Sequence, residues 1–90
     1  MATTVLASFD VADWDHWRAG YANAVAGDPD LRSSRVLRNQ DNPNNVVILE
    51  TFDTREIAER AFTSEQTREL MVADGIDMSS LRFKFYDEVD

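Results

Sequence analysis

Glu50 is the residue whose surroundings most favour chemistry. It directly follows the apolar residues 46–49, so it belongs to a stretch that should be buried. An isolated carboxyl group in such a place either pairs with a cation or stays protonated. The structural interpretation is an ion pair with Arg32, Arg35 or Arg82. The functional interpretation is a desolvated carboxyl group with a raised pKa, acting as an acid or base in a pocket.

An aromatic stripe forms a second candidate. At 100° per residue, Trp14, Trp17 and Tyr21 share one side of a helix, whereas His16 points to the opposite side. Such a stripe is typical of the buried side of a helix, and its rings could also line a flat pocket for an aromatic ligand. His16, the only histidine, should face solvent, which disfavours a role as general base or heme ligand.

Two further residues complete the candidate set. Arg35 could pair with Glu50 or with a carboxylate of a second subunit, or it could anchor an anionic ligand. Tyr86 could direct its hydroxyl inward from an edge strand. The candidate catalytic residues are therefore Glu50, Tyr21 and Arg35, and the candidate ligand-binding residues are Trp14, Trp17 and Tyr86.

Several kinds of site are disfavoured by missing residue types. With no cysteine and one histidine, only carboxylates remain as metal ligands, and residues 28–30 and 87–90 lack the alternating spacing of a calcium loop. Three glycines supply neither a phosphate-binding loop nor a Gly-x-Ser-x-Gly elbow. We therefore expect no metal and no cofactor.

Length and charge narrow the possible partners. Ninety residues predict one domain, 1–90. The formal net charge of -8 disfavours nucleic acid and anionic membrane surfaces. No apolar run approaches the roughly 18 residues of a membrane span. The absence of cysteine fits a reducing compartment, so a cytoplasmic location is expected.

Hydrophobic periodicity predicts the elements that must position these residues. Strands are expected at 3–9, 31–38, 46–52 and 81–89, and helices at 14–26, from about 54, and from about 65 to 74. This order is βαββαβ with the second helix broken in two, which is the ferredoxin-like α+β arrangement of a four-stranded antiparallel sheet with helices on one face. Strands 3–9 and 46–52 should then be central.

Polar residues and glycines predict how the helices begin and end. Asp13 and Ser64 should cap the helices that follow them, and Asp53 with Glu56 should form a reciprocal cap. Gly27 is expected at a positive φ beyond the first helix. Residues 77–79 are expected to form a loop.

The strand at 46–52 is apolar on both faces. Val46 and Ile48 point one way, and Val47 and Leu49 point the other way. Because helices cover one face only, the other face needs a second cover. A second copy of the chain is the simplest cover, so a homodimer is expected.

Three segments resemble small members of the dimeric α/β-barrel superfamily, related to the antibiotic-biosynthesis monooxygenase group and often called cyclase-like. They are Val11-Ala12-Asp13-Trp14-Asp15-His16-Trp17, the stretch from Arg35-Val36-Leu37-Arg38 through Asn42-Pro43-Asn44 to Val46-Val47-Ile48-Leu49-Glu50, and Phe62 with residues 64–71. The resemblance implies two sheets meeting as an eight-stranded barrel, with a pocket in each subunit between sheet and helices. It does not imply one reaction.

Two functions follow as hypotheses. The first is a homodimeric, cofactor-independent oxygenase, cyclase or isomerase acting on a small apolar or aromatic metabolite. The second is a non-catalytic ligand-binding or assembly module of the same fold. A polar-lined cavity holding Glu50 would favour the first. Because much of the positive charge lies on strands expected to frame the pocket, an anionic or enolate-forming ligand is also considered.

Overall fold

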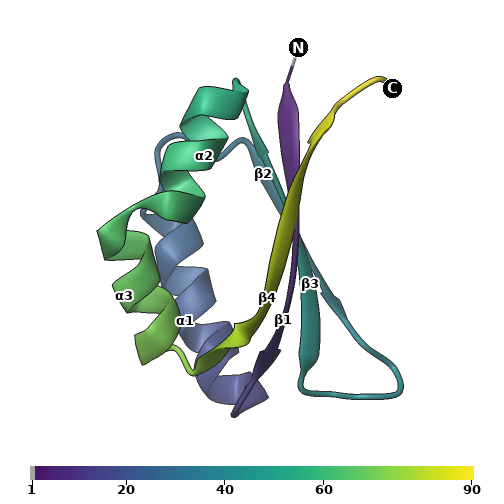
Figure 1. Cartoon of the computed structure of the whole chain (residues 1–90), viewed down its shortest axis with the longest axis vertical. Helices are drawn as coiled ribbons and strands as arrows, with labels where there is room; N and C mark the ends of the chain where they lie inside the picture. Colours follow the sequence, from purple (N-terminus) through teal and green to yellow (C-terminus); the bar gives the residue numbers. More distant parts are fainter. Residues whose placement is uncertain (1) are drawn as a thin grey trace.

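The computed structural model, which describes residues 2–90, contains one antiparallel sheet with its helices on a single face (Figure 1). The strands are β1 (Thr3–Val11), β2 (Ser33–Arg38), β3 (Asn45–Phe52) and β4 (Ile76–Asp87), and the helices are α1 (Trp14–Ala26), α2 (Arg55–Thr63) and α3 (Glu65–Ala73). The sheet order is β2-β3-β1-β4, so β1 and β3 are central. This confirms the predicted ferredoxin-like βαββαβ arrangement with a split second helix.

Alternation along the central strands builds the core. Every second residue of β1 and β3 is buried beneath the helices, and those between are half-buried on the other face. Phe52 and Val5 are completely buried. Trp17 from α1 and Ala58 from α2 close the same core from the helix side. The hydrophobic core therefore lies between the sheet and its helices.

The strand ends differ from the prediction at two places. The expected loop at 77–79 is wrong, because β4 already begins at Ile76 and pairs there with Val11. A register shift between Ser8 and Asp10 accommodates the early start, and Ser80 Oγ accepts a hydrogen bond from the Asp10 amide at 2.8 Å. β2 begins at Ser33 rather than at residue 31.

The predicted helix starts at Asp13 and Ser64 are confirmed. Asp13 accepts from the amide of His16, and Ser64 accepts from the amide of Thr67, each at 3.2 Å. Both side chains satisfy an amide that lacks a partner in the first helical turn.

Two predicted details of the helix ends are wrong. Thr54, not Asp53, caps α2, and the Asp53 carboxylate is bound by the Arg32 guanidinium at 2.7 Å. Gly27 ends α1 at a φ of -94°, so it needs no positive φ. Among the described residues, Gly75 alone has a positive φ, at 83°, in the turn from α3 into β4.

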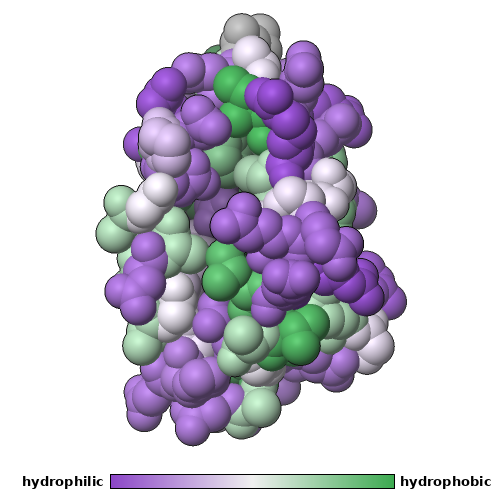
Figure 2. All heavy atoms as spheres, turned by 90° about the vertical axis from the view of Figure 1, so that its left-hand side faces the viewer, coloured by the Kyte–Doolittle hydropathy of each residue, from purple (hydrophilic) through white to green (hydrophobic). Residues whose placement is uncertain are grey.

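The two sides of the molecule have different surfaces. The helix side is mainly hydrophilic, with hydrophobic side chains showing between the hydrophilic ones (Figure 2). The far face of the sheet carries no helix (Figure 1) and presents Leu6, Val47 and Leu49, all half-buried. Within residues 2–90, no helix combines the length and the apolar character needed to cross a membrane.

Candidate functional site

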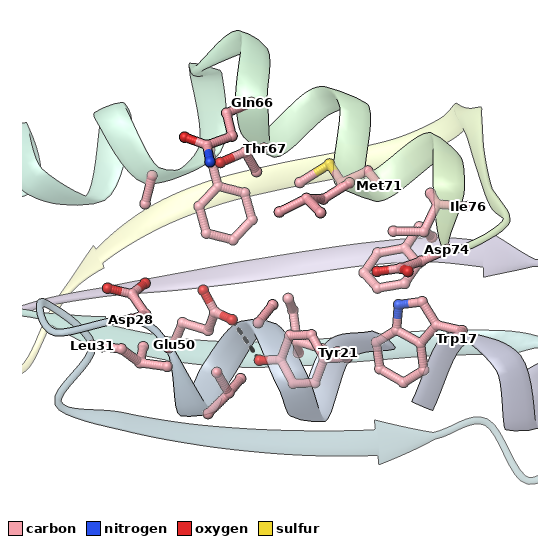
Figure 3. A pocket seen from close by; sticks show the side chains of 18 of the residues that line it. Trp17, Tyr21, Asp28, Leu31, Glu50, Gln66, Thr67, Met71, Asp74 and Ile76 are labelled. Carbon is pink, nitrogen blue, oxygen red and sulfur yellow. Dashed lines mark hydrogen bonds between the residues drawn. The ribbon is translucent and has the colours of Figure 1, made fainter. Parts of the chain in front are cut away.

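A cavity of about 320 Å³ lies between the helices and the covered face of the sheet (Figure 3). This volume is at the lower end of the roughly 300–1,000 Å³ typical of ligand pockets. Its wall is mostly apolar and is formed by α1, α2, α3, β1, β3, the start of β4 and the loop after α1. The lining residues are Phe9, Trp17, Tyr21, Ala24, Val25, Gly27, Asp28, Pro29, Leu31, Ile48, Glu50, Ala61, Phe62, Gln66, Thr67, Leu70, Met71, Asp74 and Ile76.

Glu50 and Tyr21 form a hydrogen-bonded pair in this wall. The Tyr21 hydroxyl donates to Glu50 Oε2 at 2.5 Å and lies 2.8 Å from Ser34 Oγ. Since the phenol proton goes to Glu50, Ser34 is placed to donate to the phenol oxygen. Within residues 2–90, Glu50 Oε1 has no hydrogen-bond partner, and it faces the cavity (Figure 3). One carboxylate oxygen is therefore held by Tyr21 and the other is available to a ligand.

Burial sets the protonation of this pair. Glu50 is only 8% exposed, and its desolvation raises the pKa of the carboxyl group. The hydrogen bond from Tyr21 opposes this rise, and the charge of Asp28 adds to it. Burial together with the neighbouring Glu50 raises the pKa of Tyr21, so the phenol keeps its proton. The pair therefore combines a carboxyl group of raised pKa with a fixed hydrogen-bond donor.

Local sequence explains how these side chains meet. In the β2–β3 register Ser34 lies opposite Glu50, so both point to the covered face. Tyr21 lies one helical turn beyond Trp17, and their rings stack with centroids 5.0 Å apart. Phe9 contacts Trp17 edge to face at 5.5 Å, which fixes α1 against β1. The predicted stripe therefore serves both as core and as cavity wall.

Carboxylates are the charged groups of the cavity wall. Asp28 and Glu50 lie at one end, and Asp74 lies at the other end beside Trp17 (Figure 3). Among the described residues that line the cavity there is no lysine and no arginine. The expectation that positive charge would frame the pocket is therefore wrong, and the wall offers no cationic side chain to an anionic ligand.

The predicted ion pair of Glu50 with an arginine is also wrong. Arg32 binds Asp53 instead. Arg35 lies opposite Leu49, one residue out of step with Glu50, so it belongs to the open face of the sheet. The Arg82 guanidinium donates to backbone carbonyl groups of its own strand, those of Ser79 and Leu81.

Two of the predicted ligand-binding residues lie outside the cavity wall. Trp14 packs against Trp17, and the Arg38 guanidinium lies 4.3 Å over its ring, a cation–π contact that joins α1 to β2. Tyr86 lies opposite Thr4 on the open face and is 48% exposed. The structure thus brings Glu50, Tyr21 and Trp17 together in the cavity wall and leaves Arg35, Trp14 and Tyr86 outside it.

His16 is exposed, as predicted, but it has a specific contact. Its Nε2 lies 3.0 Å from the carbonyl oxygen of Ala73, so it joins the start of α1 to the end of α3. Within the described part of the chain, no three His, Cys, Asp or Glu side chains are grouped so that they could hold a metal ion.

The sequence analysis missed Ser34, Asp28 and Asp74 as parts of the site. Ser34 could have been predicted, because successive residues of a strand point to opposite faces and Ser34 directly precedes Arg35. Asp28 stands in the turn after α1, where an acid is usually solvated. One feature of the sequence could have indicated Asp74, namely a glycine inside a helix, Gly20. The Asp74 carboxylate packs against this glycine.

Comparison with known proteins identifies the fold. No family model matches the sequence, and no curated protein matches it. A provisionally assigned antibiotic biosynthesis monooxygenase from Chloroflexus aurantiacus superposes with a TM-score of 0.76 at 14% identity, over 100% of this chain and 95% of that one. SnoaB, a cofactor-independent oxygenase from Streptomyces nogalater, gives a TM-score of 0.75 at 15% identity, over 99% and 94%.

A conserved protein from Methanosarcina mazei Go1 gives a TM-score of 0.72 at 14% identity, over 98% of this chain and 93% of that one. At such low identity these likenesses establish the fold alone. The structural neighbours of this chain are antibiotic-biosynthesis-monooxygenase-like proteins, as the sequence resemblance implied.

Proposed function

We propose that this protein is an enzyme that binds a small apolar or aromatic molecule in the cavity and moves a proton between that molecule and Glu50. The observation that carries the proposal is the buried Glu50 carboxyl group, held on one oxygen by Tyr21 at 2.5 Å and open to the cavity on the other. A buried carboxyl group lacking a cation destabilises the fold, so its presence in an open cavity favours a functional role.

The reaction class follows from this chemistry. Glu50 removes a proton from carbon, and the negative charge that results is delocalised within the substrate. The carbanion or enolate can then shift a double bond, close a ring or react with dioxygen, and none of these steps requires a cofactor from the protein. We therefore propose a cofactor-independent oxygenase, cyclase or isomerase. The fold shared with SnoaB, itself a cofactor-independent oxygenase, supports this range.

Tyr21 has a positioning role in this proposal. Its hydrogen bond stabilises the charged form of Glu50 and keeps the carboxyl group in one orientation. Ser34 in turn orients the phenol. Arg35 has no part in the proton transfer, because it lies on the opposite face of the sheet.

The proposed unit is a homodimer. The apolar residues of the open face support it, in particular Leu37, which is 44% exposed, and the half-buried Leu6, Val47 and Leu49. A second copy packed on this face would cover them and leave the cavity, which lies on the other face, accessible. A cytoplasmic location stays a prediction from the sequence.

Hydrogen–deuterium exchange of a carbon acid tests the proposal. The probe is 2-tetralone, a two-ring aromatic ketone, incubated with the protein in D₂O and followed by proton NMR at the carbon between ring and carbonyl. We expect exchange faster than in buffer, and a loss of about 100-fold or more in Glu50→Gln, the range typical of a removed general base. Tyr21→Phe should cause a smaller loss.

Glu59→Gln is the matched control, because Glu59 is exposed on α2 and bound to Arg55. Exchange that is equal in wild type, Glu50→Gln and Glu59→Gln would contradict the proposal. Binding of the probe with no exchange would support the alternative, a non-catalytic ligand-binding or assembly module of the same fold.

A further inference from the structure

The end of the cavity far from Glu50 is formed by Asp74 and Trp17 (Figure 3). Asp74 follows α3, where its backbone amide bonds to the carbonyl oxygen of Leu70. Within residues 2–90, no group donates a hydrogen bond to its carboxylate, and it takes part in no salt bridge. This carboxylate therefore has no partner of its own in the fold.

Gly20 makes room for that carboxylate. A Cβ atom at position 20 would lie 2.2 Å from Asp74 Oδ1, so any larger residue would displace the side chain. Gly20 is in the interior of α1 and has no positive φ, so the backbone does not require glycine there. Glycine in a helix interior is less stabilising than alanine, because it loses more backbone freedom on folding. The helix thus loses stability at the point where a carboxylate borders the cavity.

Asp74 is half-buried, and no lysine or arginine among residues 2–90 forms a salt bridge with it. Desolvation raises the pKa of Asp74, and the charge of the exposed His16 opposes this rise. Among the described lining residues, the charged groups are Asp28, Glu50 and Asp74. A bound cation would be attracted by these carboxyl groups, whereas a bound anion would be repelled.

We propose that the substrate is a small aromatic molecule that carries a protonated amine, with the ammonium group bound by Asp74 and the reacting carbon near Glu50. This inference rests on the proposed function, because it places the substrate in the same cavity. An ammonium group offers three donors to a carboxylate. Phe62, Met71 and Ile48 form the apolar wall along which the aromatic part lies.

Three probes of the same shape and different charge test this inference by isothermal titration calorimetry at pH 7. They are 2-(1-naphthyl)ethylamine, 2-(1-naphthyl)ethanol and 1-naphthylacetate. We expect the amine to bind at least about tenfold more tightly than the alcohol, as a charge-assisted hydrogen bond predicts. The acetate should bind most weakly.

Two variants locate the amine. Asp74→Asn should weaken amine binding by about tenfold and leave alcohol binding unchanged. Gly20→Ala keeps Asp74 in the chain but fills its place, so it should weaken amine binding similarly. The control is Asp41→Asn, which removes the same charge from the exposed loop before β3 and should leave the amine-to-alcohol ratio unchanged.

Equal binding of amine and alcohol would overturn the inference, and so would failure of all three probes to bind. An amine preference that survives both Asp74→Asn and Gly20→Ala would overturn it too, since the amine would then bind elsewhere on an acidic surface. The proposed function is judged separately, by exchange of 2-tetralone in wild type and Glu50→Gln. Intact Glu50-dependent exchange without an amine preference would reject the inference alone.

Discussion

The two faces of the sheet differ in the charged side chains that they carry and in how far those side chains are exposed. The covered face buries Glu50 with no cation beside it, whereas the open face carries Arg35, Arg82 and Lys84 in an exposed setting. Successive residues of a strand point to opposite faces, so an offset of one residue decides which face a side chain joins. The chain thereby keeps its arginines away from a carboxyl group that they would otherwise hold ionised.

The two faces should differ most in how much a truncated side chain lowers the free energy of unfolding. Phe52 is completely buried on the covered face, and Phe52→Ala should lower the free energy of unfolding by about 3–5 kcal/mol. Leu49→Ala, on the open face of the same strand, should cost clearly less at protein concentrations where the chain is monomeric. Urea denaturation measures both. Equal losses would mean that the two faces are equally buried in the monomer.

Self-association should depend on the open face. Leu49→Lys places a charge among the apolar side chains of that face and should convert the dimer to monomer without unfolding it. Val72→Lys is the control, since Val72 is exposed on α3. Sedimentation velocity at micromolar concentration measures the change. A wild-type protein that sediments only as monomer would refute the dimer.

The covered face should show an unusual dependence of stability on pH. Because the folded-state pKa of Glu50 is raised, the folded protein holds this proton over a pH range where the unfolded chain has lost it. The free energy of unfolding therefore falls as the pH rises from the ordinary glutamate pKa to the folded-state pKa of Glu50. It stays lower at every pH above that.

The titratable groups that face Glu50 are Tyr21 from α1 and Asp28 from the following loop. The charge of Asp28 disfavours ionisation of Glu50, and the hydrogen bond from Tyr21 favours it.

Glu50→Gln should remove this dependence. Glutamine keeps an oxygen for the Tyr21 hydroxyl and carries no charge, so at pH values above the folded-state pKa of Glu50 the variant should have a higher unfolding free energy than wild type. The difference should shrink at acidic pH. Melting curves at several pH values measure it, and a difference that is constant with pH would mean that the folded-state pKa of Glu50 is not raised.

The smallest effect should come from Arg35. Arg35→Gln removes an exposed charge from the open face, so unfolding free energy should change by less than about 0.5 kcal/mol. Proton exchange of 2-tetralone should be unchanged, because Arg35 and Glu50 lie on opposite faces. A large loss of exchange in this variant would mean that Arg35 acts on the cavity after all.

Most of the fold could be predicted, because the evidence for it is local. The bounds of α1 follow from Asp13 and the aromatic stripe, and both match the structure. The predictions that failed depend on distant partners. Asp53 was expected to cap α2, but it is bound by Arg32 from a separate segment. The start of β4 depends on pairing with the end of β1, which no local pattern reveals.

The site could be predicted in part. Glu50 stood out because a carboxyl group in an apolar strand has a known cost, and Tyr21 because of helical spacing. The side chain that binds Glu50 could not be predicted in this way. It could be an arginine or Tyr21 of α1, and the choice depends on which face of β2 the helices cover. Arg35 and Tyr86 lie outside the cavity because their positions in β2 and β4 direct them to the open face. Asp74 enters the site only through the packing of α3 against α1.

Direct titration of Glu50 tests the central claim, that a desolvated carboxyl group bound by Tyr21 lies in the cavity wall. The measurement is carbon NMR of side-chain-labelled glutamate in wild type and Tyr21→Phe, with Glu50→Gln to assign the signal. We expect the pKa of Glu50 to lie above the ordinary value of about 4.3, and to rise further in Tyr21→Phe, where the stabilising hydrogen bond is lost. A Glu50 that titrates at or below the ordinary value would contradict this claim.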